Sequence, residues 1–308
     1  MPEIVIAEFM DEVAVRDGLA GLDVRYDPTL VDRPDDLIGL VSGARALIVR
    51  NRTQVRGRLL DAAKKLLVVG RLGVGLDNID VQACEARSIR VIPATGANDV
   101  SVAEYVICSA MVLLRGAYHA TSGMTAGEWP RNALIGREAS GKTLGLIGFG
   151  SIAREVGKRA IALGMHVIAF DPFAHDIAFE TAGVHRHGLE PLLREADIVS
   201  LHVPLDDGTR GMIDELRLHR MKKGAILINA ARGGVADDAA VAAALRGGHL
   251  GGVALDVFEN EPLTAERAKM FAGLPNLILT PHIAGVTEES NTRVSWVIVE
   301  NVKKVLDA

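Results

Sequence analysis

Three polar residues in the second half of the chain have the chemistry of acid–base catalysis. Arg232 is followed by two glycines, Glu261 precedes a proline, and His282 follows a proline; each comes soon after an aliphatic segment. An imidazole can carry a proton near neutral pH, a guanidinium can bind a carboxylate and polarise a carbonyl, and a carboxylate can orient the imidazole. We therefore predict interconversion of a 2-hydroxy acid and a 2-keto acid, with His282 as the proton carrier.

Such a reaction also needs a hydride carrier, and the segment Gly148-Phe-Gly-Ser-Ile-Ala153 predicts one. Gly148 permits a tight turn after an aliphatic strand, and Gly150 lets the backbone approach a pyrophosphate. Ala153 is small enough for a helix to pack closely on the strand. The pyrophosphate would lie over the N-terminus of the following helix, where free N–H groups point outward.

Asp171 ends the next aliphatic segment, at the distance expected for a residue that binds the adenosine ribose. Its carboxylate could accept hydrogen bonds from both ribose hydroxyls and would repel a 2′-phosphate, so NAD is favoured over NADP. The alternative interpretation is that an aspartate before Pro172 is a turn residue.

The order of the elements predicts an α/β protein with doubly wound parallel sheets. Short aliphatic segments separated by amphipathic ones predict strands in the first hundred residues at 4–7, 24–26, 46–49, 67–69 and 91–92, with helices at 53–63 and 79–87. A second series predicts six strands at 143–147, 167–170, 198–202, 225–229, 252–255 and 277–280, with helices at 152–163, 189–195 and 237–247.

Two long helices are predicted outside these series. The first spans about 101–120, with Ser101 as N-cap and Glu104 completing a capping box. The second spans 287–306, has no strand after it, and could pack back on the first domain. We expect residues 123–132 to form an exposed arm or loop.

The composition excludes several classes of function. A net charge of −5 gives no reason to expect a nucleic-acid partner. The acidic start lacks the features of a signal peptide, and the longest apolar stretch, 102–114, is too short to span a membrane, so we expect a cytoplasmic protein without a membrane partner. Cys84 and Cys108 are expected to be small buried residues, and no metal site is predicted.

Four blocks in the same chain order resemble the signature blocks of the D-isomer-specific 2-hydroxyacid dehydrogenase family: 148–153, 231–234, 256–262 and 281–285. The similarity runs through nearly the whole chain. It is nearest to the phosphoglycerate dehydrogenase-like branch, through Val49-Arg50, the glycine-rich stretch 70–78 and Ser101-Val-Ala-Glu104.

The resemblance implies a role for each site residue. Arg232 would bind the substrate carboxylate and carbonyl oxygen, His282 would be the general acid and base, and Glu261 would hydrogen-bond the imidazole and favour its protonated form. Asp256 would bind the nicotinamide side of NAD. The full set of implied cofactor contacts is Val74, Gly148, Gly150, Ser151, Ile152, Asp171, Val203, Ala230, Ala231, Arg232, Asp256, His282 and Gly285. The implied substrate contacts are Arg50, Asn51, Arg52, Arg71, Gly73, Val74, Gly75, Arg131, Arg232 and His282.

The resemblance also implies two Rossmann-like or flavodoxin-like domains with a cleft between them that closes during catalysis. Residues 1–98 with 285–308 would form the substrate-binding domain, and residues 99–284 the NAD-binding domain. Members of the family are usually dimers or tetramers. The resemblance therefore implies a homodimer or homotetramer in which the long helix and the arm near Trp129 cross to the partner, and Arg131 would act in the neighbouring subunit's site.

Arginines in the first domain favour a substrate with a distal anion, because guanidinium groups bind tetrahedral oxyanions through paired hydrogen bonds. Arg50, Asn51 and Arg52 follow one predicted strand and Arg71 another. Arg52, and the stretch 93–99, depart from ordinary phosphoglycerate enzymes, so 3-sulfolactate with sulfopyruvate is the preferred pair. The alternatives are 3-phosphoglycerate, glyoxylate or hydroxypyruvate reduction, formate oxidation, and a non-catalytic protein that senses NAD.

Overall fold

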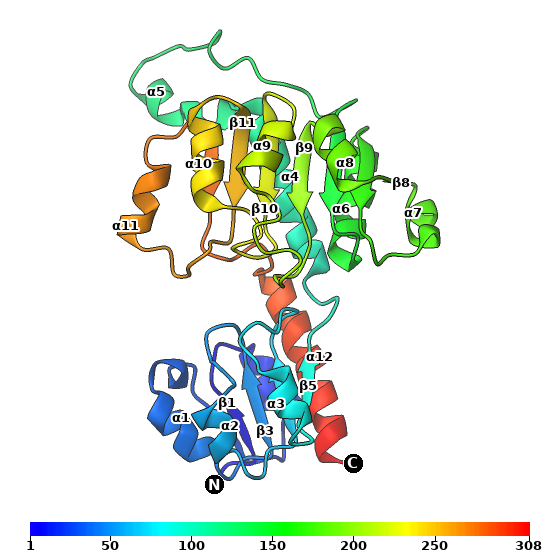
Figure 1. Ribbon diagram of the computed structural model, residues 1–308. Helices are drawn as coiled ribbons and strands as arrows, with labels where there is room; N and C mark the ends of the chain where they lie inside the picture. The colour runs from blue at the N-terminus through cyan, green and yellow to red at the C-terminus, as the bar shows by residue number, and fades with distance from the viewer. The chain divides into compact units, whose positions relative to one another are not determined.

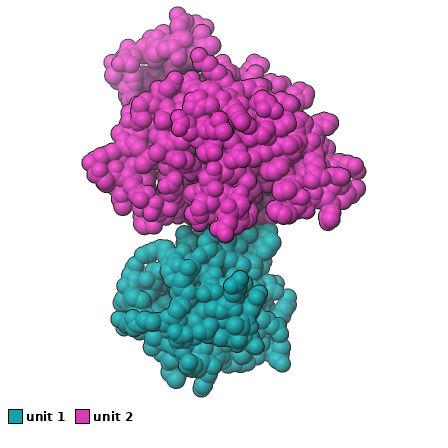
Figure 2. All heavy atoms as spheres, viewed as in Figure 1, with its two compact units in different colours: residues 1–98, 286–308 teal, residues 99–285 magenta.

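The computed structural model describes all 308 residues and divides into two compact units (Figure 2). Unit 1 consists of residues 1–98 and 286–308, and unit 2 of residues 99–285. Gly285, which the sequence analysis assigned to the first domain, belongs to unit 2. It ends the turn after Pro281, and Asp256 in unit 2 accepts hydrogen bonds from the amides of Ile283 and Ala284 in that turn.

Unit 1 is built on a five-stranded parallel sheet with the order β2-β1-β3-β4-β5. Figure 1 labels β1, β3 and β5 of this sheet. Its strands are β1 (Ile4–Ile6), β2 (Val24–Tyr26), β3 (Ala46–Val49), β4 (Val68–Arg71) and β5 (Arg90–Pro93). Its α-helices are α1 (Pro34–Val41), α2 (Arg58–Ala62), α3 (Val81–Glu85) and α12 (Glu288–Leu306).

Helices cover both faces of this sheet, which explains why the strands β1 and β3 are continuous, fully buried aliphatic runs. One face packs against α12 through Ile298, Val299 and Val302, together with the short helix Ala14–Gly18. The other face packs against α1, α2 and α3. α12 begins with a capping box formed by Thr287 and Ser290, which fixes where the returning chain becomes helical.

Unit 2 is built on a seven-stranded parallel sheet with the order β12-β11-β10-β9-β6-β7-β8. The strands are β6 (Thr143–Ile147), β7 (His166–Phe170), β8 (His185–Arg186), β9 (Ile198–Leu201), β10 (Ala225–Asn229), β11 (Leu250–Leu255) and β12 (Leu277–Leu279). The helices are α4 (Asp99–Arg115), α5 (Thr121–Thr125), α6 (Ser151–Ala162), α7 (Asp176–Ala182), α8 (Leu189–Glu195), α9 (Glu215–Arg220), α10 (Asp238–Arg246) and α11 (Ala265–Ala268).

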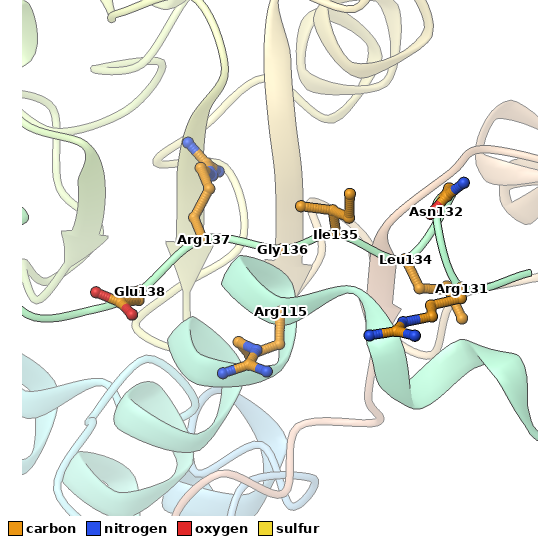
Figure 3. A pocket seen from close by; sticks show the side chains of 8 residues that line it. All are labelled: Arg115, Arg131, Asn132, Leu134, Ile135, Gly136, Arg137 and Glu138. Carbon is orange, nitrogen blue, oxygen red and sulfur yellow. The ribbon is translucent and has the colours of Figure 1, made fainter.

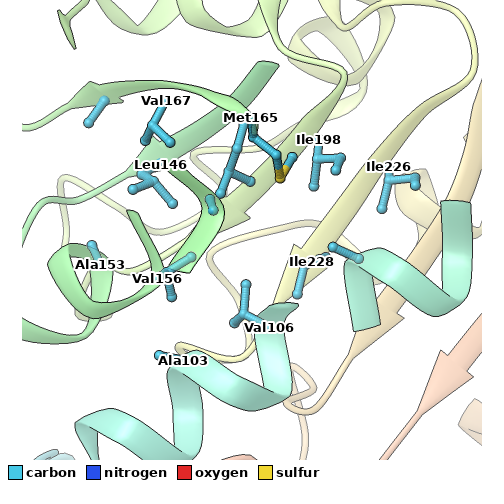
Figure 4. Packing of buried hydrophobic residues seen from close by; sticks show 14 of the residues in the cluster. Ala103, Val106, Leu146, Ala153, Val156, Met165, Val167, Ile198, Ile226 and Ile228 are labelled. Atoms are coloured by element: carbon cyan, nitrogen blue, oxygen red, sulfur yellow. The ribbon is translucent and has the colours of Figure 1, made fainter. Parts of the chain in front are cut away.

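The sheet of unit 2 lies between two helical layers. Figure 4 shows one face, where Ala103 and Val106 of α4 and Val156 of α6 meet Leu146 and Ile228 of the sheet. The other face packs against α8, α9 and α10. Both units are thus doubly wound parallel α/β folds, which confirms the predicted fold class.

The structure corrects several predicted elements. α4 begins at Asp99, so Ser101 lies buried inside the helix and is not its N-cap, and the helix ends at Arg115 because Gly116 adopts a positive φ of 61°. The predicted helix 53–63 is reduced to α2, since Gly57 has a φ of 51° and Val55 pairs with Ile79 instead. The strand β8, only two residues long, was missed. Cys84 is buried as expected, but Cys108 is exposed on α4.

None of the individual helices combines the length and the apolar character needed to cross a membrane. Helix α4 and residues 117–125, which meet at a bend of 67°, would together be long and apolar enough for a broken membrane span. Only their length and composition support this.

Candidate active site

The three residues predicted to carry the chemistry follow three adjacent strands of unit 2. Arg232 comes after β10, Glu261 after β11 and His282 after β12, and these strands are neighbours in the order β12-β11-β10. Because all strands are parallel, their carboxyl ends lie at one edge of the sheet, where open α/β folds bind ligands. The sheet order therefore brings together three side chains that are up to 50 positions apart in the sequence.

His282 and Glu261 form a hydrogen-bonded pair. Nδ1 of His282 lies 2.7 Å from Oε2 of Glu261, and the other carboxylate oxygen accepts the N–H of Phe258 at 3.1 Å. Burial alone would raise the pKa of Glu261, but the hydrogen bond and charge of His282, the N–H of Phe258 and the charge of Arg232 together lower it. Glu261 is therefore held as a carboxylate that orients the imidazole.

The turn that carries His282 is held by Asp256. This residue is 1% exposed, and its carboxylate accepts hydrogen bonds from the hydroxyl of Thr280 and the amides of Ile283 and Ala284 at 2.6 to 2.8 Å. His282 itself has a φ of 56°, in the left-handed region that non-glycine residues seldom adopt. Asp256 thus stabilises the uncommon backbone conformation of the catalytic candidate. Its expected contact with the nicotinamide side of NAD stays a prediction.

The loop of Arg232 packs against the loop that leads to Glu261. Asn229, the last residue of β10, donates to the carbonyl of Arg232 at 2.9 Å and accepts the amide of Ala231 at 3.1 Å. A side chain on Gly233 would lie 1.8 Å from the carbonyl oxygen of Phe258, so only glycine allows this approach. The charge of Arg232 also lowers the pKa of Glu261, which places the two side chains within electrostatic reach of one another.

The glycine-rich turn lies where β6 leads into α6, next to the point where the strand order reverses between β6 and β9. Gly148 has a φ of 90°, and a side chain there would meet the carbonyl of His202 at 2.5 Å and Val203 at 3.0 Å. Gly150 has open space at its Cβ position. Ser151 and Ile152 open α6, so the space above Gly150 faces the helix N-terminus and fits a pyrophosphate.

Asp171 follows β7 and ties this turn to the next loop. One carboxylate oxygen accepts the amide of Phe149 at 2.8 Å, and the other accepts the amides of Phe173 and Ala174. Both interpretations made from the sequence, a turn residue and a ribose ligand, remain compatible with this geometry. A carboxylate oxygen has a second lone pair after accepting one hydrogen bond, so Oδ2 can also accept a ribose hydroxyl.

Four of the remaining cofactor candidates lie at the same sheet edge of unit 2. Val203 follows β9, Ala230 and Ala231 follow β10, and Gly285 ends the turn of His282. Val74 is in unit 1, in the glycine-rich stretch after β4.

In unit 1, the predicted substrate residues follow β3 and β4. Arg50 is half-buried: it donates to Oδ1 of Asn291 at 2.6 Å, and its guanidinium lies 5.6 Å from the ring centre of Phe9. Burial lowers the pKa of Arg50, and the charge of Glu8 opposes this effect. Arg52 is exposed and pairs with Asp32, which raises its pKa, and Asn51 beside it is exposed.

Arg71, by contrast, is buried, with 8% of its surface exposed, and its Nη1 donates to the carbonyl of Leu72 at 2.9 Å. The guanidinium occupies the space where a side chain of Gly73 would lie, at 1.6 Å from that Cβ position. Gly73 has a φ of 143°, and Val74 and Gly75, which follow it, are half-buried.

Arg131 lies elsewhere in unit 2. It lines a cavity of about 540 Å³ at the C-terminal end of α4, together with Arg115, Asn132, Leu134, Ile135, Gly136, Arg137 and Glu138 (Figure 3). Arg137 donates to the carbonyl of Gly224, which precedes β10. The cavity is therefore at the amino edge of the sheet, opposite to the edge that carries His282, and Arg131 does not join the site of its own unit 2.

Several residues that support the site were missed by the sequence analysis. Tyr105 on α4 shares a 2.6 Å hydrogen bond with Thr280, and Thr280 donates to Asp256. Asp238 on α10 accepts the amide of Glu259 at 3.1 Å. In the sequence, the only signal for such positions is a polar residue beside an aliphatic run. Many surface residues show the same signal, so it does not identify the supporting residues.

The comparisons with known proteins agree with this geometry. The model of the family described as D-isomer specific 2-hydroxyacid dehydrogenase, NAD binding domain, matches residues 107–284. The chain is 55% identical to an (S)-sulfolactate dehydrogenase of Chromohalobacter salexigens, over 99% of each chain. It is 39% identical to a D-3-phosphoglycerate dehydrogenase of Archaeoglobus fulgidus, over 97% of this chain and 56% of that protein. A solved structure of D-lactate dehydrogenase from Aquifex aeolicus with NAD and lactic acid gives a TM-score of 0.86 at 27% identity, over 99% and 95% of the two chains.

These matches confirm the predicted family, including its phosphoglycerate dehydrogenase-like relatives, and NAD as the cofactor. The chain therefore belongs to the D-isomer-specific 2-hydroxyacid dehydrogenase family and is an NAD-dependent 2-hydroxyacid dehydrogenase.

Proposed function

We propose that the substrate is a 2-hydroxy acid with a distal anion, and specifically that the enzyme interconverts (S)-3-sulfolactate and sulfopyruvate. The observation that carries the proposal is the pair Arg50 and Arg52 on the loop after β3, at the carboxyl edge of the sheet in unit 1. Two guanidinium groups on one short loop suit a sulfonate or a phosphate. The 55% identity to a sulfolactate dehydrogenase over the full chain supports the sulfonate.

The stereochemistry of sulfolactate suits the family. The CH₂-sulfonate group outranks the carboxylate in priority, whereas the CH₂-phosphate ester of phosphoglycerate does not. The spatial arrangement called R in D-lactate and in D-3-phosphoglycerate is therefore called S in sulfolactate. A site shaped for D-acids would accept (S)-sulfolactate without a change in the position of its catalytic groups.

In the oxidation, we propose that Arg232 binds the carboxylate and the C2 oxygen, and that Nε2 of His282 takes the hydroxyl proton. Bound NAD⁺ supplies the acceptor for the hydride of C2, so the products are the keto acid, NADH and one proton. Glu261 acts on Nδ1 of His282 and so leaves Nε2 as the nitrogen that exchanges the proton. In the reduction, the same imidazolium returns the proton to the carbonyl oxygen.

We further propose that unit 2 binds NAD and that unit 1 binds the distal anion.

The functional form is a homodimer or homotetramer in the cytoplasm, without a nucleic-acid or membrane partner. The exposed aromatic residues Tyr118 and Trp129 on the segment after α4 suit contact with a second copy, because exposed aromatic side chains are enriched at interfaces.

A substrate panel with NAD⁺ tests the proposal. We expect kcat/KM for (S)-sulfolactate to exceed that for D-lactate, D-glycerate and glycolate by at least about 100-fold, since each charged hydrogen bond to the anion contributes about 1.5 to 3 kcal/mol. A preference for D-3-phosphoglycerate would leave the arginine loop as the anion-binding element, but the anion would be a phosphate instead of a sulfonate. A preference for glyoxylate or hydroxypyruvate in the reverse direction would overturn the proposal, and absence of turnover with every acid would point to a protein that senses NAD.

A further inference from the structure

The loop of Arg50 and Arg52 leaves the sheet of unit 1 at a place suited to ligand binding. The strand order β2-β1-β3-β4-β5 reverses between β1 and β3, so the connections from these two strands run in opposite directions. The carboxyl ends of strands at such a point form the ligand-binding crevice of open α/β sheets. The segment after β1 contains Glu8, and the segment after β3 contains residues 50–53.

Glu8 is a buried carboxylate, 4% exposed, and the backbone of the 50–53 loop folds around it. Oε1 accepts the amides of Arg50 and Thr53 at 2.9 and 3.0 Å, and Oε2 accepts the amide of Arg52 at 3.2 Å. Three N–H groups that converge on one carboxylate form an anion-binding nest. Here the protein fills that nest with its own side chain.

The carbonyl groups of the same loop accept hydrogen bonds from a second buried residue, Asn78. Asn78, itself 4% exposed, donates from Nδ2 to the carbonyls of Arg50 and Thr53 at 3.2 and 2.7 Å. Asn78 lies beyond β4, the neighbour of β3. Glu8 and Asn78 together fix both the donors and the acceptors of the loop backbone.

We infer that Glu8 is a positioning residue for substrate selectivity. Because its carboxylate occupies the loop amides, a substrate anion cannot use them and must be bound by side chains, above all by Arg50 and Arg52. Glu8 fixes the Cα positions from which these two side chains extend, and its charge lies next to Arg50. This inference rests on the proposed function, since it assigns the selectivity for a distal anion to the way that Glu8 holds the loop.

The substitution Glu8→Gln tests the inference, because an amide has one acceptor oxygen and would turn its NH₂ group toward at least one of the loop amides. We expect KM for (S)-sulfolactate to rise about 10- to 100-fold, as a loop displaced by about 1 Å would misplace both guanidiniums. For D-lactate, which has the same skeleton without the sulfonate, kcat/KM should change less than about threefold. The Kd of NADH should also stay within about threefold of the wild-type value.

The matched control is Glu3→Gln. Glu3 lies just before β1, at the opposite end of the same strand, and its carboxylate pairs with Arg45 at 2.6 Å. This variant loses a carboxylate of the same unit without touching the 50–53 loop, so its ratio of kcat/KM for sulfolactate over lactate should equal that of the wild type. If Glu8→Gln does not fold, Glu8→Asp is the second variant. It keeps the negative charge, but its side chain is one methylene shorter, so the carboxylate lies farther from the loop amides. We again expect a weaker reaction with sulfolactate and little change with lactate.

The outcomes separate the inference from the proposed function. A wild-type enzyme without a preference for sulfolactate over lactate would contradict the proposed function. A wild-type preference that Glu8→Gln or Glu8→Asp leaves intact, or a variant that loses both substrates in equal proportion while its melting temperature falls, would contradict the positioning role and leave Glu8 a structural residue.

Discussion

The backbone carbonyl of Asp256 accepts the amide of His282 at 2.8 Å. The carboxylate of Asp256 also holds the two residues that follow His282. One buried aspartate at the end of β11 thus sets the backbone of the turn after β12. The imidazole meets Glu261, which lies five residues after Asp256, and this short spacing means that one loop provides both the support and the orienting carboxylate.

Asp256→Asn should therefore impair catalysis through the position of His282. Asparagine keeps one acceptor oxygen but turns an NH₂ group toward a buried N–H or hydroxyl donor, at a cost of about 1 to 3 kcal/mol. We expect kcat to fall at least about tenfold and the free energy of unfolding to fall by that amount, measured by steady-state kinetics and urea denaturation. An unchanged melting temperature with a large rise only in the KM of NAD⁺ would instead favour the direct cofactor contact expected from the sequence.

Gly148 and Gly150 should respond differently to alanine. At Gly148 the positive φ and the carbonyl of His202 oppose any side chain, so Gly148→Ala should lower the melting temperature of the NAD-free protein and weaken NADH binding. At Gly150 there is open space, so Gly150→Ala should leave that melting temperature unchanged and raise the Kd of NADH about 10- to 100-fold, because the methyl group enters the space of the pyrophosphate. Tight NADH binding by Gly150→Ala, measured by fluorescence titration, would contradict the assigned pyrophosphate position.

Asp238 makes the stability of unit 2 depend on pH. Burial raises the pKa of Asp238 from 3.8 to about 6, the charges of Glu259 and Asp237 add to the rise, and the amide of Glu259 and the charge of Arg267 oppose it. Because the folded state holds this proton more tightly than the unfolded chain, its contribution to stability is full below pH 3.8 and is lost as the pH rises to about 6.

Asp238→Asn removes this charge and keeps an oxygen for the amide of Glu259. We expect its free energy of unfolding at pH 7.5 to exceed that of the wild type by up to about 3 kcal/mol, the equivalent of a shift of about two pKa units. The difference should vanish near pH 4. A variant that is less stable than the wild type at pH 7.5 in urea denaturation would show that the ionised carboxylate is required there.

The sequence pointed to the residues that are proposed to carry the chemistry, but not to the residues that hold the loops in place. Arg232, Glu261 and His282 stand beside aliphatic runs, and the rule that parallel strands end at one edge was enough to bring them together. The roles of Glu8 and Asn78 depend on hydrogen bonds to loop residues at least 25 positions away, and no local pattern encodes such partners. For the same reason the start of α4 was misplaced: Ser101 is a good N-cap by type, yet the helix begins two residues earlier, and Ser101 is buried within it.

The conformation of Arg71 also could not be read from the sequence. Its residue type suits an anion ligand, but the space above Gly73 accommodates the guanidinium, and the carbonyl of Leu72 accepts its hydrogen bond. Burial of the Arg71 side chain is a tertiary effect that the spacing of residues 70–75 does not reveal.

Glu261→Gln should preserve the fold and lower kcat about 10²- to 10⁴-fold, the range that a positioned acid–base group contributes. The amide can still accept the N–H of Phe258, but it no longer provides the negative charge beside Nδ1. Because the pKa of Glu261 is lowered, the wild-type carboxylate stays ionised at pH values below its ordinary titration range. The stability that it contributes is lost only as the pH falls through the lowered pKa. A variant with the wild-type kcat at neutral pH would remove Glu261 from the mechanism.

The most direct test of His282 as the proton carrier is the steady-state turnover of His282→Ala, measured beside its affinity for NADH. With the 2-hydroxy acid that the wild type oxidises best, kcat should fall about 10²- to 10⁴-fold while the Kd of NADH stays within about threefold of the wild-type value. A fall of less than about tenfold would contradict the assignment and require another residue at this sheet edge to carry the proton.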